Sequence, residues 1–177
     1  MKKALLIASV LFIAVISTAC INNIAVQELN NKAAEFMQKG DYDSAINRLE
    51  ASIDLDSSMY ETYYNLGIAS TNAKKYEKAI EAFQNGIKIK PDYADFYYSL
   101  AVAQAEYSEA LLEMTDDKKE ISDEDRAKSA ELIVEAISNA QKYLELKPEA
   151  EDKADVEDFI EDLGKPEKEE PTKVLEG

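Results

Sequence analysis

The residues of this chain that could support metal or acid–base chemistry are clusters of carboxylates. Asp116 and Asp117 precede a polar stretch that is typical of a turn, residues 123–125 follow it, and a third acidic group lies at 155–158. None of these groups has the glycine turn or the ligand spacing of a calcium-binding loop. Runs of this kind are common on solvated helix faces, so we expect no metal site and no cofactor.

Nucleophilic and general-base chemistry has equally little support. The chain has no His, and its only Cys is Cys20, so Cys–His dyads, Cys/His metal sites and an internal disulfide are excluded. The five Gly residues are scattered and form no phosphate-binding loop. The sequence therefore predicts a protein that is not an enzyme.

Cys20 follows a segment with the layout of an export signal. Lys2 and Lys3 precede an apolar run over 4–16, and three small residues, 17–19, lead into the Cys. This order is typical of a secretory signal peptide, which we place at 1–19. An uncleaved membrane helix is the alternative, although a span needs about 20 apolar residues.

The small residues ahead of the sole Cys resemble a bacterial lipoprotein signal. The resemblance implies that Cys20 becomes the first mature residue, carries acyl chains such as palmitate, and anchors the protein to a membrane of the cell envelope, facing the periplasm or the exterior. Ile21 is not the Asp that retains some lipoproteins in the inner membrane, which favours the outer membrane in a host that has one. Ser17 and Ala19 would equally suit an ordinary signal peptidase, so secretion without an anchor stays open.

Charge limits the class of partner. The chain carries 20 basic and 36 acidic residues, a net charge of −16. Such a field repels phosphate backbones, so we expect no nucleic-acid partner. A basic protein partner would suit this charge, and a role in solubility alone is the other interpretation.

Behind the signal, the chain repeats with a period of 34 residues. Apolar residues recur within each unit at helical spacing, and short polar or Gly-containing joints separate them. Joints of this length favour antiparallel helix pairs. The matched pairs that carry the repeat are Tyr42 with Tyr76, Ala45 with Ala79, Leu49 with Phe83, Ile53 with Ile87, Tyr63 with Tyr97, and Leu66 with Leu100.

This period and this placement of small and aromatic residues resemble the tetratricopeptide repeat (TPR) family. The second unit carries nearly the whole family pattern: Tyr63, Leu66, Gly67, Ala79, Phe83 and Pro91. The first unit is weaker, with Leu29 in place of the aromatic and Ser57 in place of the Pro. The resemblance implies an all-α solenoid of antiparallel helix pairs, and an unrelated helical bundle is the alternative.

A third unit is longer than the other two. The second-helix pattern of unit two, from Ala79 to Pro91, reappears 57 residues later, from Ala136 to Pro148, which is 34 plus 23. The extra residues are helical in pattern, so we predict a protruding helical hairpin. Ser122 and Asp125 resemble a capping box at the start of its second helix. The hairpin is either a contact surface or a tolerated lengthening.

The predicted organisation follows from these patterns. An apolar stripe from Val156 to Leu163, closed by Gly164, suits a helix that caps the solenoid. The segments are a signal peptide at 1–19, a lipid-anchored tether at 20–26, repeats at 27–59, 60–93 and 94–148 with an insertion at about 108–130, a capping helix at 149–164, and a disordered tail at 165–177.

In the TPR family the first helix of each pair lines a concave groove, and the resemblance places the binding site there. The branched apolar residues and the two Tyr suggest an apolar anchor, the carboxylates favour a basic ligand, and the absence of Lys and Arg excludes a clamp for a terminal carboxylate. Alternatively, the Tyr rings pack between helices. The predicted groove residues are Asn30, Glu61, Tyr64, Ile68, Asn72, Asp95, Tyr98, Val102 and Glu106.

The sequence thus predicts an envelope lipoprotein that acts as an adaptor or scaffold and holds another protein or peptide in this groove. A self-assembling structural homo-oligomer of the envelope is the alternative function. The two differ in oligomeric state, which the sequence leaves open.

Overall fold

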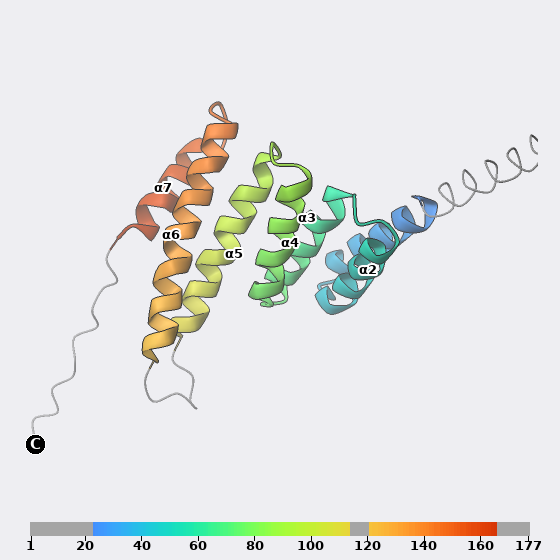
Figure 1. Cartoon of the computed structure of the whole chain (residues 1–177), viewed down its shortest axis with the longest axis horizontal. Helices are drawn as coiled ribbons and strands as arrows, with labels where there is room; N and C mark the ends of the chain where they lie inside the picture. Colours follow the sequence, from blue (N-terminus) through green and yellow to red (C-terminus); the bar gives the residue numbers. More distant parts are fainter. Residues whose placement is uncertain (1–22, 114–120, 166–177) are drawn as a thin grey trace, which may run out of the picture.

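The computed structural model describes residues 23–113 and 121–165, and every regular element in these ranges is a helix. The helices follow one another along the long axis of the molecule as antiparallel pairs (Figure 1). Their bounds are 23–38 for the first helix, then α2 (Tyr42–Leu55), α3 (Tyr60–Asn72), α4 (Tyr76–Ile89), α5 (Ala94–Leu112), α6 (Asp123–Leu146) and α7 (Lys153–Leu163). The predicted fold class, helix-pair repeats with a C-terminal helix, is confirmed.

The turns within the first two helix pairs each contain a residue with a positive φ. Gly40 has φ 73° and Lys74 has φ 56°, and the two lie one repeat apart. A left-handed residue at the end of a helix turns the chain sharply, and Gly adopts this conformation without the penalty that a side chain brings. Asp41 then accepts a hydrogen bond from the Ser44 backbone N–H at 3.1 Å and caps α2.

The core depends on pairing a glycine in one helix with a phenylalanine in a neighbouring one. Phe83 of α4 and Phe96 of α5 are both fully buried. A methyl group on Gly67 of α3 would lie well inside 3.0 Å of the Phe83 ring, and one on Gly86 of α4 would meet the Phe96 ring in the same way. The rings therefore fill the space that the missing side chains leave, as close-packed interiors require.

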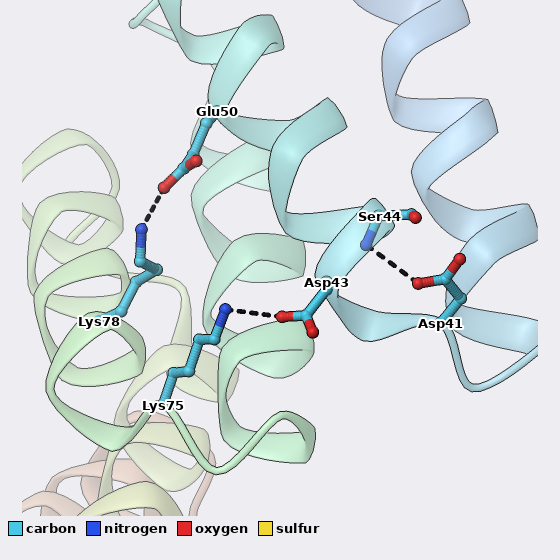
Figure 2. Close-up of polar contacts among 6 residues, drawn as sticks. All are labelled: Asp41, Asp43, Ser44, Glu50, Lys75 and Lys78. Atoms are coloured by element: carbon cyan, nitrogen blue, oxygen red, sulfur yellow. Dashed lines mark hydrogen bonds and ion pairs between the residues drawn. The ribbon is translucent and has the colours of Figure 1, made fainter.

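Side-chain ion pairs join the second helices of the first two units. Figure 2 shows Lys75 and Lys78, at the start of α4, reaching across to Asp43 and Glu50 of α2. The Lys75–Asp43 pair measures 2.6 Å between Nζ and Oδ1. Both pairs are substantially exposed, so each contributes only about 0–1 kcal/mol, and they chiefly fix the relative placement of two helices that the core already joins.

The third pair, α5 and α6, is longer than the other two, and the part of the predicted insertion at 114–120 lies outside the described residues. Figure 1 shows α5 and α6 extending past the ends of α4 and α7. Gln104, 1% exposed, donates to Glu135 at 2.5 Å and accepts from Asn139 at 2.8 Å, so it ties α5 to α6. Ser122 caps α6 by accepting from the Asp125 backbone N–H at 3.0 Å, as the sequence predicts.

The first helix begins earlier in the chain than the predicted organisation places it. The predicted tether at 20–26 overlaps the first helix, because residues 23–26 are helical and Val26 is fully buried. An apolar side chain that packs on its neighbours favours continuing the helix over a solvated linker. The predicted signal peptide, Cys20 and the tail from 166 lie outside the described residues. The capping helix is α7, and Val156 is its buried residue.

Candidate functional site

The predicted groove lies on the first helix of each pair, of which α3 and α5 are in contact with each other. On α3, Glu61 and Asn72 are exposed, whereas Ile68 is half-buried. On α5, Val102 and Glu106 are half-buried. The other four predicted residues are half-buried too, but their side chains make specific contacts with neighbouring segments.

Tyr64 belongs largely to the core. Its ring lies 5.5 Å from Phe96, 5.7 Å from Tyr93 and 6.1 Å from Phe83, measured between ring centroids. Its hydroxyl accepts a hydrogen bond from Ser99 Oγ at 3.3 Å. Edge-to-face aromatic contacts of this kind stabilise the pair beyond the area they bury, so Tyr64 helps to hold α3 on α5.

Tyr98 packs against the end of the solenoid. Its ring centroid lies 5.3 Å from that of Tyr143 on α6 and 6.0 Å from that of Phe159 on α7. Burial, with smaller contributions from the Asp152 and Asp155 carboxylates, raises the pKa of the Tyr98 hydroxyl. Both predicted anchor rings thus pack against rings of other segments while staying half-buried.

Two other predicted groove residues hold helices together. The amide Nδ2 of Asn30 lies at hydrogen-bond distance from Ser52 Oγ, 2.8 Å, and from Thr62 Oγ1, 3.1 Å, and so links the first helix to α2 and α3. Asp95 Oδ1 lies 2.5 Å from Nζ of Lys147, the residue that follows α6. Its charge is already paired, and it offers less to a basic ligand than the sequence suggests.

Glu106 lies at the rim of a hollow that the sequence did not reveal. The hollow has a volume of about 920 Å³ and lies where α5 continues beyond the turn between α3 and α4. The pKa of Glu106 is raised, mainly by burial and then by the Glu109 carboxylate, whereas the nearby Lys74 lowers it. The spacing of Glu106, Glu109 and Glu113 along α5 was the available signal, because residues at i, i+3 and i+7 share a helix face.

In residues 23–113 and 121–165, no three His, Cys, Asp or Glu side chains are grouped so as to hold a metal ion. In the same ranges, no helix is both long and apolar enough to cross a membrane. The candidate site is the surface formed by α3, α5 and the turn beside them.

Comparison with known protein families agrees with this architecture. A family model described as "TPR repeat" matches residues 33–70 and 72–111. A curated relative, small glutamine-rich tetratricopeptide repeat-containing protein 2 of Mycosarcoma maydis, is 32% identical over 79 residues. That match covers 45% of this chain and 22% of the relative, so the chain spans about a fifth of the relative's length.

Solved structures share the fold at low sequence identity. The first TPR of Spaghetti (RPAP3), bound to an HSP90 peptide, has a TM-score of 0.59 at 18% identity and covers 77% of this chain and 90% of its own. The second TPR domain of human RPAP3, in complex with an HSP70 peptide, has a TM-score of 0.61 at 16% identity, covering 79% and 98%.

The Arabidopsis OM64 TPR domain is similar in the same way, with a TM-score of 0.62 at 15% identity over 80% of this chain and 98% of that domain. At these identities the likeness is one of fold. The family model adds the sequence pattern, and the helix pairs of the structure occupy the matched residues. Residues 33–70 and 72–111 of this chain are therefore similar in sequence to the tetratricopeptide repeat family and share its fold with solved TPR structures.

Proposed function

We propose that this chain is an envelope lipoprotein that acts as an adaptor, anchored through Cys20 and holding a partner protein on the face formed by its first helices. The observation that carries the proposal is the open part of that face: Ile68 on α3 and Val102 and Glu106 on α5 stay partly exposed on two contacting helices. Two proteins of this fold are known with peptides bound to them, which supports a peptide or protein as the ligand.

The open residues indicate the chemistry of the ligand. Ile68 and Val102 offer apolar contact at the middle of the face, while Glu61 and Glu106 supply negative charge on α3 and α5. None of the nine predicted groove residues is basic. An apolar segment flanked by Lys or Arg is therefore the ligand that this surface fits best, because complementary charge selects among partners of similar shape.

Capture of the partner tests the adaptor function. Full-length chain carrying an affinity tag is recovered from detergent-solubilised envelope of its own host, as wild type and as two double variants. Glu61→Lys with Asn72→Lys alters two exposed groove residues on α3. Glu81→Lys with Gln84→Lys alters two exposed residues of α4 and serves as the control.

We expect wild type and the α4 control to recover the same partner, and the α3 variant to lose most of it. Loss of the partner from both variants would indicate a general effect of charge. Recovery of the partner by the α3 variant would mean that the groove is not its binding site. Light scattering on the same preparations separates an adaptor from the self-assembling alternative, for which a single higher mass would be found without any partner.

Anchoring is tested separately. Cys20 is the sole thiol of the chain, so labelled palmitate can report on this residue alone through its sulfur. A Cys20→Ser variant should lose the label and leave the membrane fraction. Retention in the membrane with the first 19 residues still attached would show an ordinary membrane helix and contradict the lipoprotein assignment.

A further inference from the structure

The length of α5 creates a notch at its C-terminal end. α3 ends at Asn72, and the turn at Lys74 leads directly into α4 at Tyr76, whereas α5 continues to Leu112. The last turns of α5 therefore project past the α3–α4 turn, as Figure 1 shows. The space between them is the hollow of about 920 Å³. We call it the α5 notch; its lining residues used below are Lys74, Tyr76, Glu106, Tyr107, Glu109, Leu112 and Glu113.

Aromatic rings form one wall of the α5 notch. Tyr76 and Tyr107 stack with their centroids 5.8 Å apart and their planes at 23°. The Tyr107 hydroxyl donates to Glu77 Oε1 at 2.9 Å, which fixes that ring. Both rings are half-buried, and Leu112 adds apolar surface beside them. The face of a tyrosine ring carries partial negative charge and attracts cations.

Carboxylates form another part of the lining. Glu106 and Glu109 fall on successive turns of one face of α5, and Glu113 is the residue that follows the helix. Among residues 23–113 and 121–165, no Lys or Arg lies within ion-pair distance of any of the three, although Lys74 stands at the edge of the notch. Burial, followed by these three carboxylates, raises the pKa of Tyr76.

At two other places in this chain, a lysine lies between a carboxylate and the face of an aromatic ring. Lys147 Nζ lies 2.5 Å from Asp95 Oδ1 and 5.4 Å from the centroid of the Tyr143 ring, so it sits between a carboxylate and an aromatic face. Lys90 takes a similar position over Tyr60, at 5.4 Å from the ring centroid. The α5 notch has the carboxylates and the ring faces of these two sites. Lys74 lines the notch, but it forms no ion pair with Glu106, Glu109 or Glu113.

We propose that the α5 notch receives a lysine- or arginine-rich segment of a partner protein. This inference rests on the proposed adaptor function and names the chemistry of the partner at one end of the groove. The ammonium or guanidinium groups of the segment pair with Glu106, Glu109 and Glu113, while their aliphatic stems lie on Tyr76 and Leu112. In this proposal, the extension of α5 in the third repeat provides the carboxylates of the notch.

A direct binding measurement tests this proposal with a defined probe. A fluorescein-labelled hexalysine peptide is titrated with the full-length chain in a non-ionic detergent, at an ionic strength that screens distant charges. The notch variant carries Glu106→Gln, Glu109→Gln and Glu113→Gln. The control variant carries Glu81→Gln, Glu149→Gln and Glu151→Gln, which are exposed and outside the notch. Each variant removes three negative charges, so both change the overall field equally.

The notch variant should bind hexalysine at least about tenfold more weakly than wild type, and the control should change by less than about twofold, since three ion pairs of ordinary strength together give a factor of that order. Equal losses in both variants would mean general attraction to an acidic chain and would overturn the proposal. So would unchanged binding by the notch variant. Neither outcome touches the adaptor function, because partner capture from the envelope tests that function independently.

The aromatic wall has its own matched pair of variants. Tyr76 and Tyr42 occupy the same position in successive repeats and are both half-buried, so Tyr76→Leu and Tyr42→Leu disturb comparable packing. Only Tyr76 lines the notch. Hexalysine binding should weaken about two- to fivefold in Tyr76→Leu and stay unchanged in Tyr42→Leu. Equal affinities of the two variants for hexalysine would mean that the Tyr76 ring does not contribute to binding.

Discussion

Gly86→Ala should destabilise this protein, although the same change stabilises most helices. Gly86 lies inside α4, and replacing a helical glycine by alanine ordinarily gains about 1 kcal/mol through backbone propensity. Here the added methyl group would stand well inside 3.0 Å of the Phe96 ring, closer than real Cβ contacts come. Phe96 is 0% exposed and touches Tyr60, Tyr64 and Phe83, so the ring cannot move without displacing its neighbours.

The balance of the two effects gives the expected magnitude. Overpacking of a well-filled core costs about 1–3 kcal/mol, and a fully buried ring held by other rings should fall in the upper part of that range. After the gain in propensity of about 1 kcal/mol, the free energy of unfolding should drop by about 1–2 kcal/mol. In a domain of this size that corresponds to a fall in Tm of roughly 2–8 °C.

Chemical denaturation followed by far-ultraviolet circular dichroism measures the change. The double variant Gly86→Ala with Phe96→Leu supplies the control, because the smaller side chain makes room for the methyl group. The two changes should therefore cost less together than the sum of their separate costs. If Gly86→Ala alone raises the free energy of unfolding, or if the two changes are additive, the ring does not occupy the space over Gly86 and the packing account is wrong.

Three further predictions follow from single sites. Ala79→Leu should lower the free energy of unfolding by about 1–3 kcal/mol because Ala79 is 0% exposed. The control Glu81→Gln should change the free energy of unfolding by less than about 0.5 kcal/mol. Equal effects of the two variants in thermal melts would contradict the burial of Ala79. Lys74→Gly should raise the free energy of unfolding by about 0.5–1 kcal/mol, because a φ of 56° strains a residue that has a side chain. A lower free energy of unfolding in chemical denaturation would exclude backbone strain at this position. Burial and a neighbouring carboxylate raise the pKa of Tyr93 to about 12, whereas an unfolded tyrosine ionises near pH 10. Its contribution is therefore present below about pH 10 and lost by about pH 12, and Tyr93→Phe should flatten this loss in stability measured against pH.

The sequence was most informative where structure depends on local pattern. The 34-residue period aligned Ala79 and Phe83 with their counterparts in the first unit, and both are fully buried in the structure. The spacing of Ser122 and Asp125 indicated the start of α6, where the Ser side chain caps the helix. These features are set by residues within one or two helical turns, or by a repeat that the chain itself displays, so reading along the chain finds them.

The candidate site was less accessible because it depends on contacts between distant segments. Tyr98 stands on the face predicted for a ligand, yet Phe159, on the capping helix, packs against it. Asn30 similarly meets Thr62 of the next repeat. The α5 notch requires knowing how far α5 extends past the turn at Lys74, which is a comparison of helix ends that periodicity fixes only approximately.

The central claim is that a partner protein lies against the first helices of the repeats, and site-specific photo-crosslinking in intact cells of the host tests it most directly. A photoreactive amino acid replaces Val102, half-buried on α5 in the predicted groove, or Val134, which is 67% exposed on α6 and outside that groove. The account predicts a light-dependent adduct of defined mass from position 102 and none from position 134. No adduct from position 102, or the same adduct from both positions, would contradict it.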